Sequence, residues 1–158
     1  GAMEFLRARN WTADRVIIFG RSLGAAVGME TALRVPPAGL IIESAFTSIP
    51  AMGRRHYPLL NLLLGWMIDA KYDNLAKIAD LNNPVLLIHG RKDTICPPAM
   101  AEQLYSRAVE PKQIYWIDAA GHNSGLVVGG AGYRELLRQA IEDWTGVKQG
   151  AAKADEGL

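Results

Sequence analysis

One stretch decides how this chain folds: residues 16–28, which read VIIFGRSLGAAVG. The four apolar residues Val16–Phe19 predict a buried strand, and the small residues after Ser22 predict a helix packed closely on a sheet. Gly20 and Gly24 lie two positions before and after Ser22, where a tight turn is expected to exclude side-chain bulk. A strand that turns sharply into a helix at a serine is typical of a nucleophile elbow, which exposes the serine hydroxyl. The same five residues also fit a structural turn, because glycine and serine are common in loops.

Three further apolar runs predict the rest of a sheet, and they are Ala38–Glu43, Pro84–Gly90 and Gln113–Asp118. All are continuous rather than alternating, which is typical of strands buried on both faces of a parallel sheet. Helices are expected around these runs at Glu4–Trp11, Ala25–Arg34, Ala99–Val109 and Tyr133–Trp144. The alternation of strands and helices predicts an α/β fold, a three-layer sandwich around a mostly parallel sheet of about four strands.

The length of 158 residues fits one domain, which we place at residues 1–146. Its least regular part, residues 45–83, is rich in leucine and too apolar for a solvated loop. This part fits either a helix packed on the sheet or a cap whose apolar side roofs a pocket above Ser22. Residues 147–158 are small and polar, and they are expected to form a disordered tail.

The composition argues against several classes of protein. A net charge of +1 gives no reason to expect nucleic acid as a partner. The longest apolar stretch, Pro58–Ile68, is interrupted by Asn61 and Gly65 and is too short to span a bilayer. The single cysteine, Cys96, cannot form an internal disulfide. This fits a reducing compartment, and we expect a cytoplasmic protein.

A serine nucleophile needs a base to take its proton, and the chain contains three histidines. His122 follows the last predicted strand and Ser22 follows the first, so both are expected at the carboxyl edge of the parallel sheet. His56 lies in the apolar segment beside two arginines, and His89 ends a strand, so structural roles are expected for both. His122 is therefore the predicted base.

Two carboxylates compete to orient that base. Asp93 lies in the loop after the third predicted strand, although prolines nearby also fit it to a role in a turn. Glu43 ends the second strand and is the alternative acid. The order Ser22, Asp93, His122 along the chain is a nucleophile–acid–base order used by serine triads. Asp93 is therefore the predicted acid, and Glu43 remains its rival.

Four segments carry a resemblance to a known family, and they read GRSLGAAVG, LIIESAFTSIPAM, PVLLIHGRKDTICPP and AAGHNSG. Over roughly residues 10–146 the chain resembles the C-terminal part of an α/β-hydrolase, in the serine-hydrolase branch that includes acyl-ester and thioester hydrolases. The resemblance implies that Ser22 is the nucleophile, Asp93 the acid and His122 the base. It also implies that Leu23 supplies a backbone N–H to the oxyanion hole, and that the reaction needs no metal and no organic cofactor.

The chain departs from this family because the strands that precede the nucleophile strand have no counterpart here. The loop that supplies the second oxyanion N–H in the family is therefore also missing from the expected fold. Losing one such donor lowers the rate by a factor on the order of 10²–10³. The nucleophile strand is then expected at an edge of the sheet, where unpaired N–H and C=O groups invite pairing with another chain. We therefore expect a homodimer through Val16–Phe19, in which the partner can lend the missing donor.

These observations predict a truncated α/β-hydrolase fold that cleaves short acyl esters or thioesters through an acyl-enzyme. One alternative is a catalytically weak or inactive hydrolase fold that serves as a homo-oligomeric module. Another is a fragment of a longer hydrolase, whose upstream strands complete the site. The set of Ser22, Asp93 and His122 favours the enzyme, whereas the missing oxyanion loop favours the module.

Overall fold

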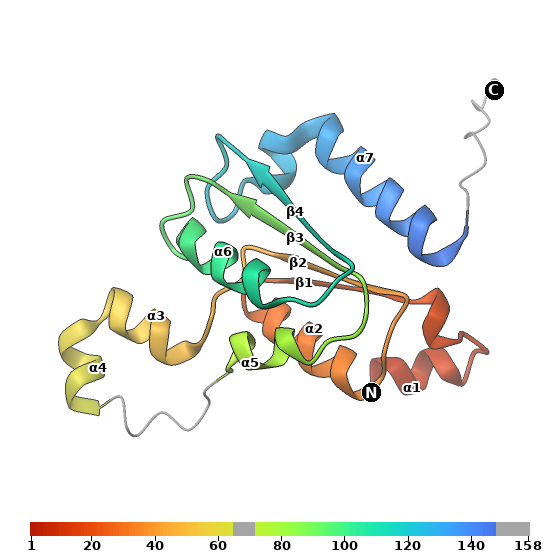
Figure 1. Cartoon of the computed structure of the whole chain (residues 1–158), viewed down its shortest axis with the longest axis horizontal. Coiled ribbons are helices and arrows are strands. Elements are labelled where there is room, and N and C mark those ends of the chain that lie inside the picture. Colours follow the sequence, from red (N-terminus) through yellow and green to blue (C-terminus); the bar gives the residue numbers. More distant parts are fainter. Residues whose placement is uncertain (65–71, 148–158) are drawn as a thin grey trace, which may run out of the picture.

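The computed structural model of the chain describes residues 1–64 and 72–147, and its centre is a parallel sheet of four strands (Figure 1). The strands are β1 (Ile17–Arg21), β2 (Gly39–Glu43), β3 (Val85–Gly90) and β4 (Lys112–Ile117). They lie in the order β1-β2-β3-β4, so their order in space follows their order along the chain. Every pairing is parallel, which confirms the predicted sheet and places β1 at one of its edges.

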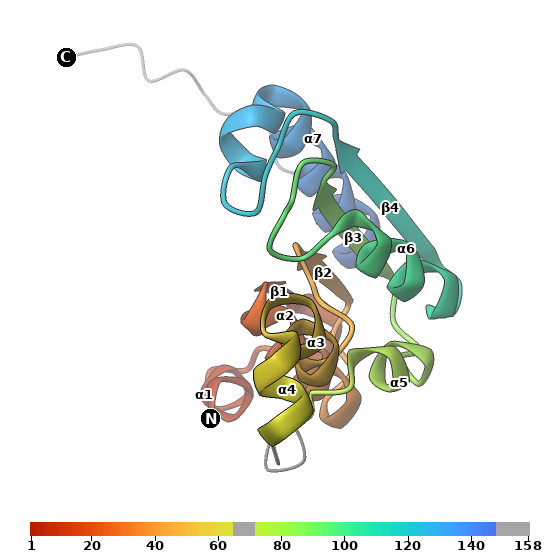
Figure 2. The same cartoon turned by 90° about the vertical axis from the view of Figure 1, so that its left-hand side faces the viewer.

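Helices cover both faces of the sheet, which confirms the predicted three-layer fold (Figures 1 and 2). Among the described residues, one face carries three helices, α2 (Leu23–Arg34), α5 (Asn74–Ala79) and α6 (Pro98–Arg107), and the other carries α7 (Gly125–Thr145). Successive side chains of a strand point to opposite faces. Leu40 and Ile42 of β2 therefore pack with the first group, while Ile41 packs with α7. The continuous apolar runs thus supply two cores, one on each face.

The last helix differs most from its prediction. It begins at Gly125 instead of Tyr133, and Gly130, with φ +52°, interrupts its helical geometry. Four glycines lie in the part that was not predicted. Glycine disfavours the helix interior by about 1 kcal/mol relative to alanine, so the sequence pattern indicates only the part of the helix that follows these glycines.

The chain before β1 forms a short helix, α1 (Ala2–Arg7), and a 3₁₀ turn, η1 (Ala13–Arg15). The helix ends four residues before the predicted end at Trp11. β1 itself runs on to Arg21, two residues beyond the predicted Phe19, so the strand continues directly to Ser22.

The segment predicted as a cap, residues 45–83, contains α3 (Ile49–His56), α4 (Pro58–Leu64) and α5, and its residues 65–71 lie outside the described residues. α3 and α4 project beyond the carboxyl ends of the strands (Figure 1). Leu59 and Leu62 of α4 are 70% and 78% exposed. α4 therefore exposes apolar side chains, whereas Met52 of α3 packs against a buried cluster that includes Ala26 of α2. α5 contacts α2 and α6 on the sheet.

The predicted tail, residues 147–158, lies outside the described residues apart from Val147. In the described ranges, no helix is long and apolar enough to cross a membrane. Within the same ranges, no group of three or more His, Cys, Asp or Glu side chains is arranged to hold a metal ion.

Candidate active site

The turn from β1 into α2 is centred on Ser22 and is strained. Ser22 has φ +52° and ψ −118°, a conformation that costs a non-glycine residue about 1–3 kcal/mol and is concentrated at functional sites. Its N–H donates to the carbonyl oxygen of Glu43 at 2.9 Å, which fixes the turn to β2. A Cβ added to Gly20 would lie 2.4 Å from the carbonyl oxygen of Gly24, so this position requires glycine. At Gly24 an added Cβ would meet no atom within 4 Å, so the expectation that this position excludes a side chain is wrong on steric grounds.

The three predicted triad residues come together at the carboxyl edge of the sheet. Nε2 of His122 lies 3.1 Å from Oγ of Ser22, and its Nδ1 lies 2.8 Å from Oδ2 of Asp93. The residues follow β1, β3 and β4, whose parallel direction brings these loops to one edge. With its proton on Nδ1, the imidazole donates to Asp93 and leaves Nε2 free to accept the proton of Ser22. General-base activation of a serine requires this arrangement.

Asp93 is held by its own loop as well as by His122. Its Oδ1 accepts hydrogen bonds from the backbone N–H groups of Ile95 at 2.9 Å and Cys96 at 2.8 Å. The side chain is fully buried, so these donors and His122 replace water around the carboxylate. Asp93 therefore has both roles, because Oδ1 stabilises the turn while Oδ2 orients His122.

His89 and His56 contact this acid loop rather than Ser22. Nε2 of the buried His89 lies 2.8 Å from the carbonyl oxygen of Cys96 and 3.6 Å from Asp93 Oδ2. Burial lowers the pKa of His89, although its hydrogen bond to Cys96 and the charge of Asp93 act in the opposite direction. The imidazole is therefore neutral near pH 7. His56 lies on α3, where its Nε2 is 2.7 Å from the carbonyl oxygen of Ile95.

Glu43, the alternative acid, is bonded elsewhere. It is 5% exposed, and its Oε2 accepts a hydrogen bond from the hydroxyl of Tyr133 at 2.9 Å. Burial, with a smaller contribution from the Glu43 charge, raises the pKa of Tyr133, so the phenol keeps its proton and remains the donor. The structure therefore joins His122 to Asp93, and joins Glu43 to α7.

Leu23, the predicted oxyanion donor, is the first residue of α2. Backbone N–H groups in the first turn of a helix have no acceptor within the helix, and the helix dipole favours negative charge there. This position suits the Leu23 N–H for a developing oxyanion beside Ser22.

Sequence reasoning missed three residues that surround the triad. Tyr133 bonds Glu43, Arg21 donates to Oδ1 of Asn123, and the hydroxyl of Ser44 donates to the carbonyl oxygen of His122 at 3.3 Å. These contacts join residues 78 to 102 positions apart, and no local pattern indicates them. Arg21 and Ser44 nevertheless follow or end strands at the predicted edge, which is the signal that could have identified them.

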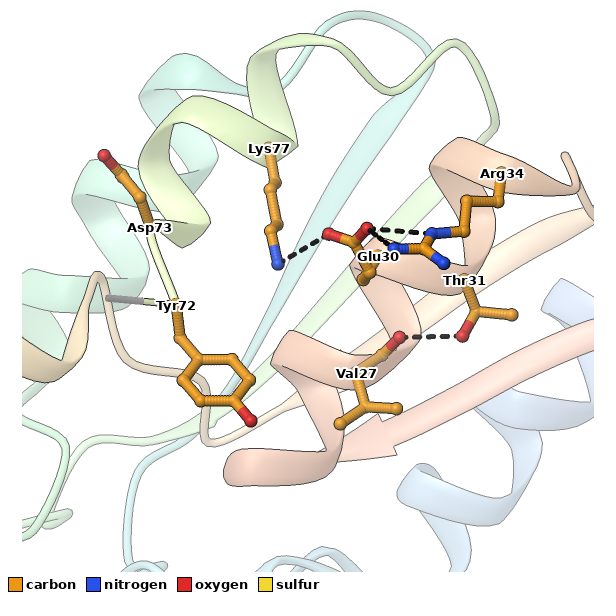
Figure 3. A pocket seen from close by; sticks show the side chains of 7 residues that line it. All are labelled: Val27, Glu30, Thr31, Arg34, Tyr72, Asp73 and Lys77. Carbon is orange, nitrogen blue, oxygen red and sulfur yellow. Dashed lines mark hydrogen bonds and ion pairs between the residues drawn. The ribbon is translucent and has the colours of Figure 1, made fainter. Parts of the chain in front are cut away.

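A pocket of about 540 Å³ lies between α2 and α5, and none of the three triad residues lines it (Figure 3). At its wall, Glu30 of α2 pairs with Arg34 at 2.7 Å and with Lys77 of α5 at 2.9 Å. The Glu30 carboxylate bridges the two cations, so it joins the two helices and leaves the three groups with a net charge of +1. The pocket is therefore separate from the triad and has a structural explanation.

Known proteins similar in sequence are longer than this chain. It is 36% identical over 129 residues to an uncharacterized protein of Mycobacterium tuberculosis, a match that covers 82% of this chain and 45% of that protein. It is 32% identical over 129 residues to alpha/beta hydrolase domain-containing protein 17B of Homo sapiens, covering 81% of this chain and 42% of that protein. The chain thus spans less than half the length of these relatives. No protein-family profile matches it.

Solved structures share the fold at low sequence identity. An esterase of Pyrococcus furiosus superimposes with a TM-score of 0.73 and 18% identity, covering 91% of this chain and 60% of the esterase. An acetyl xylan esterase from Paenibacillus sp. R4 gives a TM-score of 0.70 and 18% identity, covering 90% and 49%. With the relatives named as α/β-hydrolase domain proteins, this likeness identifies the four-stranded chain as the C-terminal part of an α/β-hydrolase.

Proposed function

We propose that this chain carries the catalytic triad of a serine hydrolase that cleaves acyl esters or thioesters. The observation that carries the proposal is the pair of hydrogen bonds at His122, whose Nε2 accepts from Ser22 at 3.1 Å and whose Nδ1–H donates to Asp93 at 2.8 Å. The strained backbone of Ser22 supports it, because such strain persists where a site requires it. The esterases among the structural neighbours are consistent with this chemistry.

In the proposed reaction, Oγ of Ser22 attacks the acyl carbonyl carbon while its proton passes to Nε2 of His122. The oxyanion that forms is stabilised by the N–H of Leu23. Collapse of the tetrahedral intermediate breaks the bond to the alcohol or thiol, and His122 gives its proton to that leaving group. Water, activated by the same imidazole, then hydrolyses the acyl-enzyme and restores Ser22. The Nδ1–H of His122 donates to the Asp93 carboxylate throughout, and Asp93 does not take up this proton.

The surface beyond the strand ends favours an apolar acyl group. The exposed side chains of Leu59 and Leu62 lie on α4, which projects past the same edge that carries the triad. We propose that this part of residues 45–83 contacts a short acyl chain, because ligand sites are lined mostly by apolar side chains. Small acyl esters are therefore the substrates to test first.

The edge position of β1 supports the expected homodimer. Phe19 on this strand is 48% exposed, and Leu23 and Val27 on the following helix are both 53% exposed. We propose that a second copy pairs with β1 and contributes a second oxyanion donor, because an apolar strand edge favours strand addition. Light scattering of the chain at assay concentration tests this, and a uniform monomer rejects it.

Labelling with a fluorophosphonate and turnover of p-nitrophenyl acetate test the triad directly. Both should occur in the original protein and disappear in Ser22→Ala. Ser106→Ala removes a hydroxyl from the surface of α6 and should leave both unchanged. Equal labelling of the original protein and Ser22→Ala would reject the enzyme. Absence of labelling from a folded original protein would favour the alternative of a non-catalytic module.

A further inference from the structure

The end of β2 forms a buried corner, Glu43 and Ser44, that contacts both the nucleophile and the base. The carbonyl oxygen of Glu43 accepts the N–H of Ser22 at 2.9 Å. The hydroxyl of Ser44 donates to the carbonyl oxygen of His122 at 3.3 Å. Ser44 has φ +49°, a conformation rare for a residue other than glycine, and its N–H donates to the carbonyl oxygen of Ile88 at 3.0 Å. The corner is thus fixed between β1, β3 and the loop that carries His122.

The carboxylate of Glu43 extends this link to α7. Its Oε2 accepts the hydroxyl of Tyr133, and its Oε1 lies where a Cβ at Gly125 would approach to 2.3 Å. Gly125 is the first residue of α7 and stands three positions after His122. Gly130 interrupts the helix between these two contacts. Glu43 therefore contacts α7 on both sides of its kink and fixes the start of the helix that follows the base.

We propose that Glu43 and Ser44 are positioning residues that hold Ser22 and His122 at reacting distance. The inference rests on the proposed function, and neither residue acts on the substrate. Its physical basis is the sensitivity of proton transfer to geometry, since a displacement of about 1 Å can cost on the order of 100-fold in rate. Ser22 and His122 are 100 positions apart, and the corner connects to the main chain of both.

The test compares Ser44→Ala, Glu43→Gln and Glu43→Ala with the original chain. One readout is kcat and KM for p-nitrophenyl acetate, and the other is the low-field proton resonance of the His122–Asp93 hydrogen bond. Ser44→Ala and Glu43→Ala should lower kcat by about 10- to 100-fold with KM nearly unchanged, and should shift or broaden the resonance. Glu43→Gln should retain most of the activity, because its amide oxygen can still accept from Tyr133. Ile78→Val, in the core on the opposite face, is the control for lost thermal stability.

Three results would overturn the inference. The first is that Ser44→Ala and Glu43→Ala reduce kcat no more than Ile78→Val and leave the resonance unchanged. The second is that Glu43→Gln loses as much activity as Asp93→Asn, which would make the Glu43 charge itself part of the triad. The third applies if Glu43→Ala fails to fold: normal kinetics and a normal resonance in Ser44→Ala then reject the role. If Ser22 is not labelled at all, the proposed function fails, while the resonance still decides the positioning role.

Discussion

Asp93 and Glu43 are buried carboxylates that follow or end neighbouring strands at one edge of the sheet, yet their partners differ. Asp93 accepts two backbone N–H groups on one oxygen and the imidazole of His122 on the other. Glu43 accepts only the neutral phenol of Tyr133 among its described side-chain hydrogen bonds. Residue type and strand position therefore do not decide which carboxylate serves a base. The donors of the loop decide it, because they aim the second oxygen of Asp93 at His122.

The largest effect that separates the two carboxylates is expected on turnover. Asp93→Asn should lower kcat by about 10⁴-fold, because an amide N–H₂ facing Nδ1 favours the His122 tautomer that cannot accept the Ser22 proton. Steady-state hydrolysis of p-nitrophenyl acetate measures this, with Glu43→Gln as the matched control. A fall of tenfold or less in Asp93→Asn would remove the functional difference between the carboxylates.

The second effect is expected on the stability of the protein, and it concerns Glu43 rather than Asp93. Tyr133→Phe leaves Oε2 of the buried Glu43 without its donor, which should reduce the free energy of unfolding by about 1–3 kcal/mol. Urea unfolding gives this value. Tyr105→Phe removes a hydroxyl from α6 and should change stability by much less. Equal losses in the two variants would show that the Tyr133 hydroxyl contributes little to holding Glu43.

The third effect is a pH dependence of stability that arises from His89, whose Nε2 lies 3.6 Å from Oδ2 of Asp93. Burial lowers the pKa of His89 in the folded protein, so below its ordinary value near 6.5 the unfolded chain binds more protons. Stability present above that pH should therefore decrease as the pH falls from about 7 to about 5, by at most about 1.4 kcal/mol per pH unit. His89→Gln keeps a donor for the Cys96 carbonyl and removes the titration. Urea unfolding across this range should give a flatter profile for the variant, and parallel profiles would contradict the assignment.

The smallest effect is expected on the rate at which iodoacetamide modifies Cys96, which lies in the same loop as Asp93. Burial, and then the charge of Asp93, raise the pKa of the Cys96 thiol to about 12, so little thiolate is present at pH 8. Iodoacetamide should modify Cys96 slowly in the folded protein and rapidly in urea, as followed by mass spectrometry. Asp93→Asn should speed the folded-state reaction slightly. Rapid modification of the folded original protein would show that the loop around Asp93 opens readily.

Periodicity and the order of motifs were sufficient to predict the sheet and its parallel direction, whereas the edge position of β1 was predicted from the resemblance to α/β-hydrolases. They also indicated that Ser22, Asp93 and His122 would share one edge, because the carboxyl ends of parallel strands meet there. What they could not indicate was the direction of each side chain. Glu43 satisfied the same positional rule as Asp93. The contacts of the two side chains distinguish them, because Glu43 meets Tyr133 and Gly125 while Asp93 meets His122.

Two other features, the first half of α7 and the space around Gly24, depend on how distant parts of the chain pack, which a local sequence pattern does not indicate. The first half of α7 is rich in glycine, and it becomes helical where Glu43 approaches Gly125 and Ile117 packs with Tyr133. Gly24 illustrates the opposite error, because the motif suggested a steric need that the space around it does not impose. Of the two glycines, Gly20 is the one at which an added Cβ would clash with a neighbouring atom.

The match between strand order in space and strand order along the chain makes this sheet a modular unit. Strands elsewhere in a longer polypeptide can be added beside β1 without any connection having to cross β2, β3 or β4. Ser22, Asp93 and His122 all lie on the loops of these four strands. Adding strands beside β1 can therefore lengthen the sheet without changing the Ser22–His122 and His122–Asp93 distances, because those loops set them.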